Sequence, residues 1–290
     1  MTNVQSLARA VVVVTGGGSG IGRALCHLAA RRGARVVVAD LLPDRSHAVA
    51  AEITRWGGTA LARVCDVGDL TSVQTLADDT IQHFGTVNLV CNNAGVCMGG
   101  SVEATRPDDA RWMFEVNVFG VYNGIRVFAP LLRASAGRGE FAWLLNTGSE
   151  NSLGIPPVGA VGLYNASKHA VLALSDNARL DLAGSGVGVS LLCPALVRTD
   201  LLDCQAHRPD RLGGPQSLSD AARARVTALM DAKGHDADDT AAIALNGVEA
   251  GEFLIVPHAE VRPFVQARVD MVLAALDAAD ARDAWTPISR

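Results

Sequence analysis

The sequence is short of aromatic residues, of basic charge and of paired cysteine motifs, and each shortage narrows what the protein can be. Only 4% of the 290 residues are aromatic, and acidic residues outnumber basic ones, which gives a net charge of −5. This balance argues against nucleic acid or an anionic membrane surface as a partner. Because no CxxC motif is present, we expect free thiols and a reducing, cytoplasmic compartment for the six cysteines, Cys26, Cys65, Cys91, Cys97, Cys193 and Cys204.

Long apolar runs and clusters of metal ligands are missing as well. The valine run at 11–14 is too short to span a bilayer, and no basic segment followed by a cleavable apolar stretch precedes it. We therefore expect a soluble protein without a membrane partner. Cys204 and His207 lie close together, but no further Cys/His cluster supplies the remaining ligands, so we predict no metal site.

Hydrophobic residues make up 49% of the chain, and they form short valine- and leucine-rich runs between longer stretches of helical periodicity. Continuous apolar runs are typical of parallel strands buried on both faces, and their alternation with helices is typical of βαβ units. The pattern predicts an α/β, doubly wound fold with a parallel sheet. We expect helices at 20–32, 43–56, 70–84, 108–133, 164–183 and 236–249, and strands at 11–14, 35–40, 60–66, 87–93, 141–149, 187–194 and 252–257.

No domain boundary is visible, so we expect one domain over 1–290 with a core at about 10–257. Region 198–220 mixes proline, glycine and charge directly after a strand, which indicates either a lid or a plain surface excursion. The stretch 260–279, within a tail at about 258–290, has apolar residues at helical spacing. We interpret it as a helix that packs on the core or forms a subunit interface.

The loop TGGGSGIG at 15–22 follows the first strand and opens the first helix. Glycines permit the sharp bend and the close approach of a diphosphate, which the free N–H groups and the dipole of the helix N-terminus would bind. A plain tight turn is the alternative. The expected cofactor contacts in this loop are Gly16, Ser19, Gly20, Ile21 and Gly22.

Asp40 closes the second strand. A carboxylate at this point accepts hydrogen bonds from both hydroxyls of an adenosine ribose and repels a 2′-phosphate. Neither Ser19 nor Leu41 is basic, so no cation is placed for that phosphate, and we predict NAD(H) in preference to NADP(H). A methyltransferase can also combine a glycine loop with an acid at the second strand, so these residues alone leave the reaction open.

The segment YNASK at 164–168 puts Tyr164 one helical turn before Lys168, on the same face. The pair is either an accident of helix spacing or a proton-transfer device, and further motifs favour the second. In order, these are Asp66-Val67, Asn92-Asn-Ala-Gly95, Asn117, Ser149 and the segment 194–199. With them, residues 10–257 resemble the short-chain dehydrogenase/reductase (SDR) family. The resemblance implies a single Rossmann-like domain with a seven-stranded sheet, and a homodimer or homotetramer.

The resemblance also assigns roles. Oxidation of a secondary alcohol needs a base for the hydroxyl proton, and a nearby ammonium lowers the pKa of a tyrosine towards the working range. Tyr164 is then the acid/base and Lys168 its tuner, which also holds the nicotinamide ribose. Ser149 would donate to the substrate oxygen, and Asn117 would anchor a water in a proton path from Lys168. Further cofactor contacts would come from Asp66, Val67, Asn93, Ala94, Gly95, Pro194, Val197 and Thr199.

The sequence departs from the family pattern at two places. Ser149 lies fifteen residues before Tyr164, which exceeds the usual gap, so Ser152 is a rival for the catalytic hydroxyl. We prefer Ser149, because Ser152 would lie beyond the strand tip. The usual Pro-Gly after the sixth strand is Pro194-Ala195, which is tolerable if the backbone there needs no positive φ.

The leading hypothesis is an NAD(H)-dependent oxidoreductase that acts on a secondary alcohol or ketone. A cofactor-sensing protein with the same fold and no significant turnover is the alternative. The apolar residues that follow Ser149 and begin the lid favour a hydrophobic or aromatic substrate, unless they merely pack the lid. The expected pocket wall is Leu153, Ile155, Pro156, Val158, Val161 and Leu202.

Overall fold

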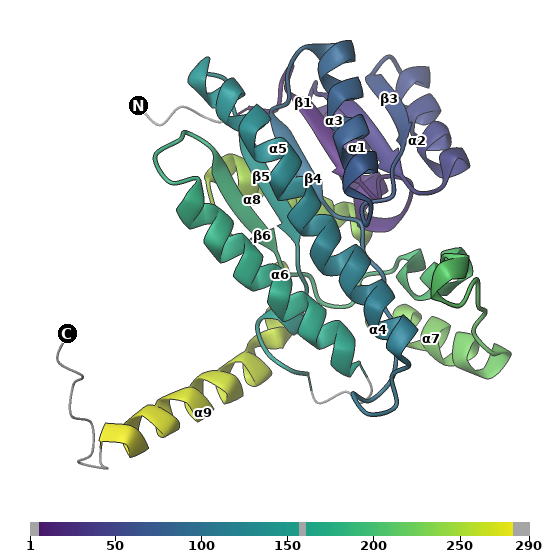
Figure 1. Ribbon diagram of the computed structural model, residues 1–290, viewed down its shortest axis with the longest axis vertical. Helices are drawn as coiled ribbons and strands as arrows, with labels where there is room; N and C mark the ends of the chain where they lie inside the picture. Colours follow the sequence, from purple (N-terminus) through teal and green to yellow (C-terminus); the bar gives the residue numbers. More distant parts are fainter. Residues whose placement is uncertain (1–5, 157–160, 281–290) are drawn as a thin grey trace.

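The computed structural model describes residues 6–156 and 161–280, and its centre is a seven-stranded sheet of order β3-β2-β1-β4-β5-β6-β7 (Figure 1). Every neighbouring pair of strands is parallel. The predicted doubly wound α/β sheet is therefore confirmed. The strands are β1 Val11–Thr15, β2 Arg35–Asp40, β3 Thr59–Val64, β4 Leu89–Asn92, β5 Trp143–Thr147, β6 Gly188–Leu192 and β7 Leu254–Ile255.

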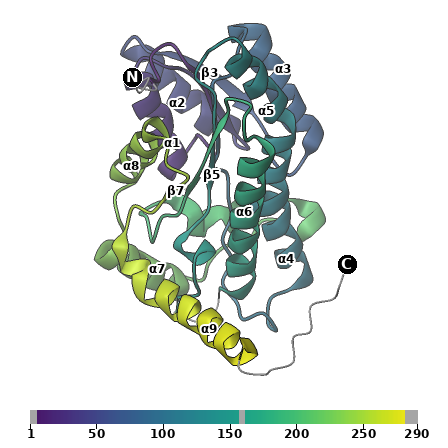
Figure 2. The ribbon, with the colours of Figure 1, turned by 90° about the vertical axis from the view of Figure 1, so that its left-hand side faces the viewer.

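Alternate side chains of each central strand enter one of two hydrophobic layers. In β1, Val12 and Val14 pack with one cluster of buried residues, whereas Val11 and Val13 pack with a second cluster on the opposite face. Helices α1, α2 and α8 cover the first face, and α3, α5 and α6 cover the second. Figures 1 and 2 show these two groups of helices on opposite sides of the sheet. This burial on both faces is the reason for the continuous apolar runs in the sequence.

Most of the expected helices are present within a few residues of their predicted ends. The expected helix at 108–133 differs, because five residues at Glu115–Phe119 form a π-helical turn that divides it into α4 and α5. Helix α7 was not expected, since its periodicity gives only a weak amphipathic pattern. The helices are α1 Gly20–Arg31, α2 Pro43–Arg55, α3 Leu70–Phe84, α4 Pro107–Phe114, α5 Gly120–Gly137, α6 Gly162–Asp181, α7 Asp220–Lys233, α8 Ala237–Ala250 and α9 Arg262–Asp280.

The expected lid region contains two short 3-10 helices, Asp200–His207 and Asp210–Leu212, which lead into α7. Arg208, between them, is fully buried and pairs with Asp109 of α4, and its guanidinium lies 5.7 Å from the Trp112 ring. Removal of one partner of a buried ion pair destabilises the fold by several kcal/mol, because the other charge stays buried without compensation. The region is therefore held against α4, and its role as a lid stays a prediction.

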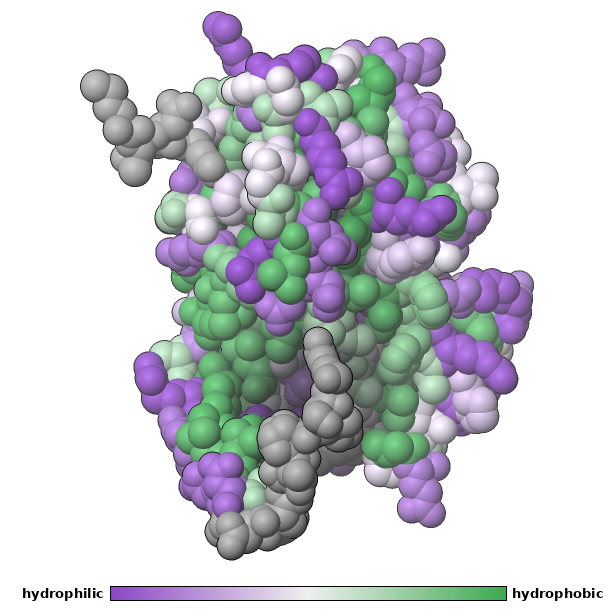
Figure 3. All heavy atoms as spheres, turned by 60° about the vertical axis from the view of Figure 1, so that its left-hand side comes forward, coloured by the Kyte–Doolittle hydropathy of each residue, from purple (hydrophilic) through white to green (hydrophobic). Residues whose placement is uncertain are grey.

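Helix α9 forms as predicted, but it does not pack on the core. Its start lies against the loop after β5, since a Cβ at Gly154 would come within 2.9 Å of the Phe264 carbonyl oxygen. Beyond this point the helix projects away from the sheet (Figure 1), and Figure 3 shows hydrophobic surface gathered on the half of the molecule that carries it. Val269, Val272 and Leu276 are 43–56% exposed. Packing on the core was thus the wrong alternative, and a role in a subunit interface stays a prediction.

None of the helices in the described part of the chain is long and apolar enough to cross a membrane.

Candidate active site

A cavity of about 410 Å³ opens at the carboxyl ends of the strands, which is the edge where doubly wound folds bind ligands. Its walls come from the segments after β1, β2, β3, β4, β5 and β6, together with α6 and the lid region. The predicted site residues that line it are Gly16, Ser19, Gly20, Ile21, Asp40, Asp66, Val67, Asn93, Ala94, Gly95, Ser149, Tyr164, Lys168, Pro194, Val197 and Thr199.

The glycine loop leaves room that side chains would fill. A Cβ at Gly20 would lie 2.8 Å from Thr199 Cγ2, and Gly16 and Gly20 have φ of 63° and 49°, which side chains disfavour. Gly22 lies behind the cavity wall, where a Cβ would come within 2.1 Å of the Gly16 carbonyl oxygen. Ser19 precedes α1 and its side chain does not cap the helix. The first N–H groups of α1 therefore suit a phosphate.

Asp40 lines the cavity at the end of β2. One carboxylate oxygen accepts from the Gly18 N–H at 2.9 Å and the other from the Leu42 N–H at 3.0 Å. These two bonds fix the carboxylate and leave further lone pairs for a diol. The expectation of no nearby cation was incomplete, because α2 brings Arg45 to the same wall, where it approaches Asp200 at 3.7 Å.

Tyr164 and Lys168 lie on the first turns of α6, both buried, with the ammonium 5.7 Å from the centre of the phenol ring. Lys168 Nζ donates to the Thr147 carbonyl oxygen at 3.0 Å. Burial lowers the pKa of Lys168 to about 8. Burial raises the pKa of the Tyr164 hydroxyl, and the neighbouring Ser149 side chain opposes that rise. The phenol is thus neutral and carries the proton that it can donate to a substrate oxygen.

The two rival serines have different environments. Ser149 follows β5 and begins the 3-10 turn at 150–152, where its hydroxyl donates to the Asn151 side-chain oxygen at 3.4 Å and accepts from the Asn151 N–H at 3.3 Å. Ser152 lies one 3-10 turn later, where its hydroxyl donates to the Lys168 carbonyl oxygen at 2.8 Å and accepts from the Ser149 N–H at 3.1 Å. Its single proton is therefore engaged with the backbone of α6. Of the two, Ser149 lines the cavity.

Asn117 lies in the π-helical turn, fully buried behind the cavity wall. Its amide nitrogen donates to the Val96 carbonyl oxygen at 2.9 Å and to the Ser167 hydroxyl at 3.0 Å, and its amide oxygen accepts from the Val96 N–H at 2.8 Å. A Cβ at Gly95 would lie 3.3 Å from this oxygen and 3.6 Å from Lys168 Nζ. Both amide hydrogens are used, so the side chain could hold a water only through its oxygen.

The expected pocket wall is correct in part. Val161 and Leu202 line the cavity, and Val158 lies outside the described residues. Leu153, Ile155 and Pro156 do not line it, because the 3-10 turn at 150–152 directs the chain away from the cavity. Leu153 packs against a separate cluster, and Ile155 is 55% exposed. The wall instead includes residues that the sequence analysis did not single out, Val96, Cys97, Trp112, Val116, Leu229 and Met230.

Comparisons with known proteins agree with this arrangement. The family model of the short chain dehydrogenases matches residues 10–209. The chain is 40% identical over 209 residues to a 1-deoxy-11-beta-hydroxypentalenate dehydrogenase of Streptomyces exfoliatus, which covers 71% of this chain and 74% of the relative. It is 30% identical over 253 residues to a C alpha-dehydrogenase of Sphingobium sp. strain SYK-6, with 87% of this chain and 81% of the relative covered.

A solved structure matches over the full length. The crystal structure of a short chain dehydrogenase/reductase from Burkholderia phymatum, in complex with NAD, superposes with a TM-score of 0.83 at 34% sequence identity, and the match covers 100% of both chains. These matches disfavour both the methyltransferase and the cofactor-sensing alternatives. The chain therefore belongs to the short-chain dehydrogenase/reductase family and is an oxidoreductase that acts on the CH–OH group of an alcohol or on the corresponding ketone.

Proposed function

We propose that the protein is an NAD(H)-dependent dehydrogenase or reductase of a hydrophobic secondary alcohol or ketone, built as one domain, with Tyr164 as the acid/base. The observation that carries the proposal is the convergence of Tyr164, Lys168 and Ser149 on one cavity that also contains the glycine loop. Oxidation of an alcohol requires one group to take the hydroxyl proton and another to accept a hydride. The nicotinamide, when bound, supplies the hydride acceptor.

Tyr164 is suited to move the proton. In the reductive direction its neutral phenol donates a proton to the carbonyl oxygen. In the oxidative direction it must become a phenolate, which the Lys168 ammonium stabilises by its charge. A pKa of about 8 leaves Lys168 largely protonated at neutral pH. Its bond with Thr147 O holds the ammonium in place without neutralising it.

Ser149 is the better of the two serines for contact with the substrate oxygen. Ser149 and Tyr164 both line the cavity, so one substrate oxygen could contact both hydroxyls. Charge develops on that oxygen during the reaction, and a positioned donor stabilises it. Asn117 would join the proton path through an oxygen atom, as its amide hydrogens are engaged.

The cavity fits a dinucleotide whose diphosphate lies on the glycine loop and the start of α1. Asp40 would hold the adenosine ribose, with Asp66 and Val67 at the adenine, and the segment 93–95 beneath the ribose. Pro194, Val197 and Thr199 would contact the nicotinamide half. Asp40 favours NAD(H), because its carboxylate would face a 2′-phosphate at close range. Arg45 would instead attract a 2′-phosphate, but its guanidinium is already paired with Asp200.

The substrate end of the cavity is mostly apolar. Trp112, Leu202 and Met230 come from α4, the lid region and α7, and they surround the approach to Tyr164 together with Val96 and Val161. Such walls desolvate an alicyclic or aromatic secondary alcohol well and leave the hydroxyls of a sugar without partners. Two of the relatives, the hydroxypentalenate dehydrogenase and the C alpha-dehydrogenase, are likewise named as dehydrogenases.

A spectrophotometric screen tests the proposal. The protein is incubated with NAD⁺ or NADP⁺ and a panel of secondary alcohols, and reduced cofactor is followed at 340 nm. We expect turnover with NAD⁺ and with aryl or alicyclic alcohols. Faster turnover of polyols would contradict the pocket assignment, and comparable kcat/KM for both cofactors would contradict the preference for NAD⁺.

We also propose a homodimer or homotetramer in the cytoplasm. Exposed apolar side chains on the helices flanking the sheet support assembly, among them Phe119 just before α5, Tyr122 on α5 and Leu180 on α6. The exposed face of α9 adds a third surface of this kind. Light scattering coupled to size exclusion measures the mass in solution, and a monomer would refute the assembly.

A further inference from the structure

The segment from Pro194 to Thr199 has no helix or strand of its own, although it forms the cavity wall expected at the nicotinamide. Two histidines from distant parts of the chain hold it. The backbone of His235, between α7 and α8, donates to the Leu196 carbonyl oxygen at 2.8 Å and accepts from the Arg198 N–H at 2.9 Å. The ring of His258, after β7, accepts from the Ala195 N–H at 3.1 Å.

The two imidazole rings also contact each other. They are stacked with centroids 3.5 Å apart and planes inclined by 14°. Nε2 of His235 lies 2.7 Å from a carboxylate oxygen of Glu260, and this contact fixes the His235 ring. His258 is only 8% exposed. The backbone of one histidine and the ring of the other thus form a clamp on the wall, which we call the histidine clamp (His235 and His258).

The hydrogen bond from the Ala195 N–H determines the protonation state of the His258 ring. A backbone N–H can only donate, so Nδ1 of His258 must carry a free lone pair. A second proton on this ring would set two donors against each other and would place a positive charge against the stacked His235. The other charged or titratable groups around the clamp are Glu260, Glu150, Arg198 and Asp236. Burial and His235 lower the pKa of His258, whereas Glu260 acts in the opposite direction.

We infer that His258, seated on His235, is a positioning residue that fixes the wall 194–199 against the nicotinamide half of the cofactor and releases this wall in acid. The inference rests on the proposed function, because that function places the nicotinamide at this wall. Ala195 is tolerated where the family has glycine for a separate reason, because it is not among the described residues with positive φ.

Equilibrium binding of NAD⁺ to the full-length protein, measured by calorimetry between about pH 5 and 8, tests the inference. In the unmodified protein, affinity should be constant above about pH 6.5 and fall below it, because protonation of His258 breaks the bond. Lys168 and Tyr164 stay protonated throughout the acid part of this range, so neither produces the change.

Two variants separate the acceptor from the charge. His258→Asn keeps an acceptor oxygen near the position of Nδ1 and does not titrate, so it should bind NAD⁺ like the unmodified protein at pH 8 and show no loss in acid. His258→Leu leaves the Ala195 N–H unpaired and should weaken binding about 5- to 50-fold at pH 8. His27→Asn, on α1 beside Glu52, is the matched control for the loss of a histidine, and it should retain the acid loss.

The outcomes distinguish the two proposals. If the unmodified protein binds no NAD⁺, the proposed function fails. If it binds NAD⁺ but His258→Leu binds equally well, or His258→Asn retains the acid loss, the histidine clamp is overturned. A loss that disappears in His207→Asn instead would assign the pH effect to His207 in the cavity wall. Should His258→Leu not fold, the pH profile of His258→Asn decides.

Discussion

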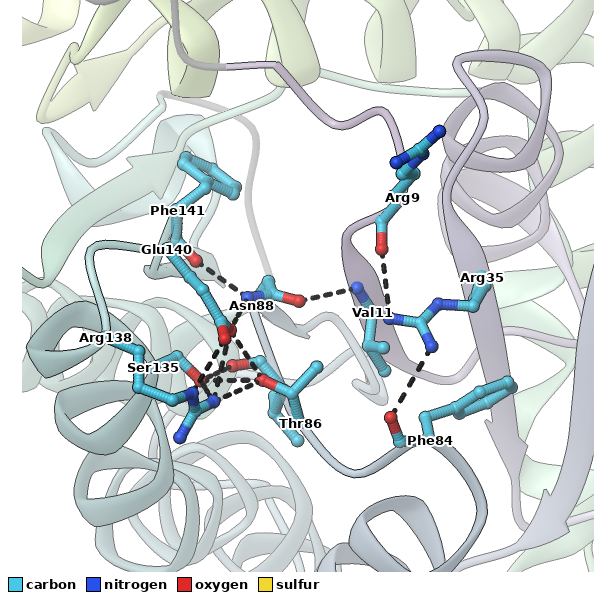
Figure 4. Close-up of polar contacts among 11 residues, drawn as sticks. Arg9, Val11, Arg35, Phe84, Thr86, Asn88, Ser135, Arg138, Glu140 and Phe141 are labelled. Atoms are coloured by element: carbon cyan, nitrogen blue, oxygen red, sulfur yellow. Dashed lines mark hydrogen bonds and ion pairs between the residues drawn. The ribbon is translucent and has the colours of Figure 1, made fainter.

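The two edges of the sheet both contain clusters of polar groups, but the ion pair in the amino-edge cluster is partly exposed, whereas Tyr164 and Lys168 at the carboxyl edge are buried. At the amino edge, Figure 4 shows Glu140 at the centre of a closed network, in which it accepts hydrogen bonds from Asn88, Thr86 and Arg138. Arg138 lowers the pKa of Glu140 to about 2, so the acid and its partner are both charged. Asn88, Thr86 and Arg138 each find an acceptor in Glu140, as expected of a cluster that stabilises the fold.

At the carboxyl edge the partners are incomplete. Lys168 is buried, and it bonds to a carbonyl oxygen, not to a carboxylate. The pKa of Lys168 falls to about 8, and that of Tyr164 rises, because burial disfavours both charged forms. pKa shifts that favour the neutral forms are typical of a functional site, whereas the pKa shift of Glu140 favours its charged form and is typical of a complete ion pair. The comparison teaches that burial and the direction of the pKa shift together separate the functional cluster from the structural one.

Among the variants that test this comparison, the largest loss of kcat is expected at Tyr164. Tyr164→Phe removes the proton-transfer group and keeps the packing, so kcat should fall by at least the ~10²–10⁴-fold typical of a lost general acid/base, with NAD(H) affinity largely kept. Tyr122→Phe is the matched control, because Tyr122 is 41% exposed on α5, and it should have no effect. Steady-state kinetics checks both, and ordinary turnover by the Tyr164 variant would overturn the mechanism.

A smaller loss is expected at the serines. Ser149→Ala removes the donor to the developing oxyanion and should lower kcat on the order of 10²-fold. Ser152→Ala should lower kcat much less and should reduce the melting temperature, because it leaves the Lys168 carbonyl oxygen and the Ser149 N–H without their partner.

Ser135→Ala extends this test to the amino edge, where Ser135 donates to the Val87 carbonyl oxygen at 2.6 Å. It should reduce stability and leave kcat unchanged. A larger loss of kcat for Ser152→Ala than for Ser149→Ala would move the catalytic hydroxyl to Ser152.

The amount that the sequence predicts differs between these regions for physical reasons. Seven strands and their order along the chain follow from local apolar runs, which burial on both faces of a sheet requires. The glycine loop and the Tyr164–Lys168 spacing are local as well. The histidine clamp joins positions 195, 235 and 258, and the pairing of Arg208 with Asp109 spans 99 positions. Contacts between residues so far apart leave no periodic pattern in the sequence. The contacts of the lid region, the part of the cavity wall formed by α7 and the position of Arg45 were therefore not predicted.

A moderate effect is expected on the choice of cofactor. Asp40→Ala combined with Leu41→Arg removes the carboxylate that repels a 2′-phosphate and adds a cation, so the ratio of kcat/KM for NAD⁺ over NADP⁺ should fall by about 10-fold or more. Once the Asp40 carboxylate is removed, the guanidinium of Arg45 would also attract the 2′-phosphate and would add to the preference for NADP⁺. Kinetics with both cofactors measures the ratio, and an unchanged ratio would show that Asp40 does not set it.

The smallest effect is expected from the amino edge, at Glu140. Its folded pKa of about 2 lies below the ordinary value for a glutamate, so its contribution to stability is present above about pH 4.3 and is lost as the pH falls towards 2. Glu140 and Arg138 are 36% and 47% exposed, so solvent screens the pair and its contribution is small.

Glu140→Gln should therefore lower the melting temperature by only about 2–4 °C at pH 7, and the difference from the unmodified protein should vanish near pH 2. The kcat and KM of the folded variant should not change, because its side chain lies at the edge of the sheet opposite the cavity. Calorimetry across this pH range, with kinetics at pH 7, measures both quantities. A change in kcat at unchanged stability would show that the two edges are coupled, and that the closed network at the amino edge takes part in the reaction after all.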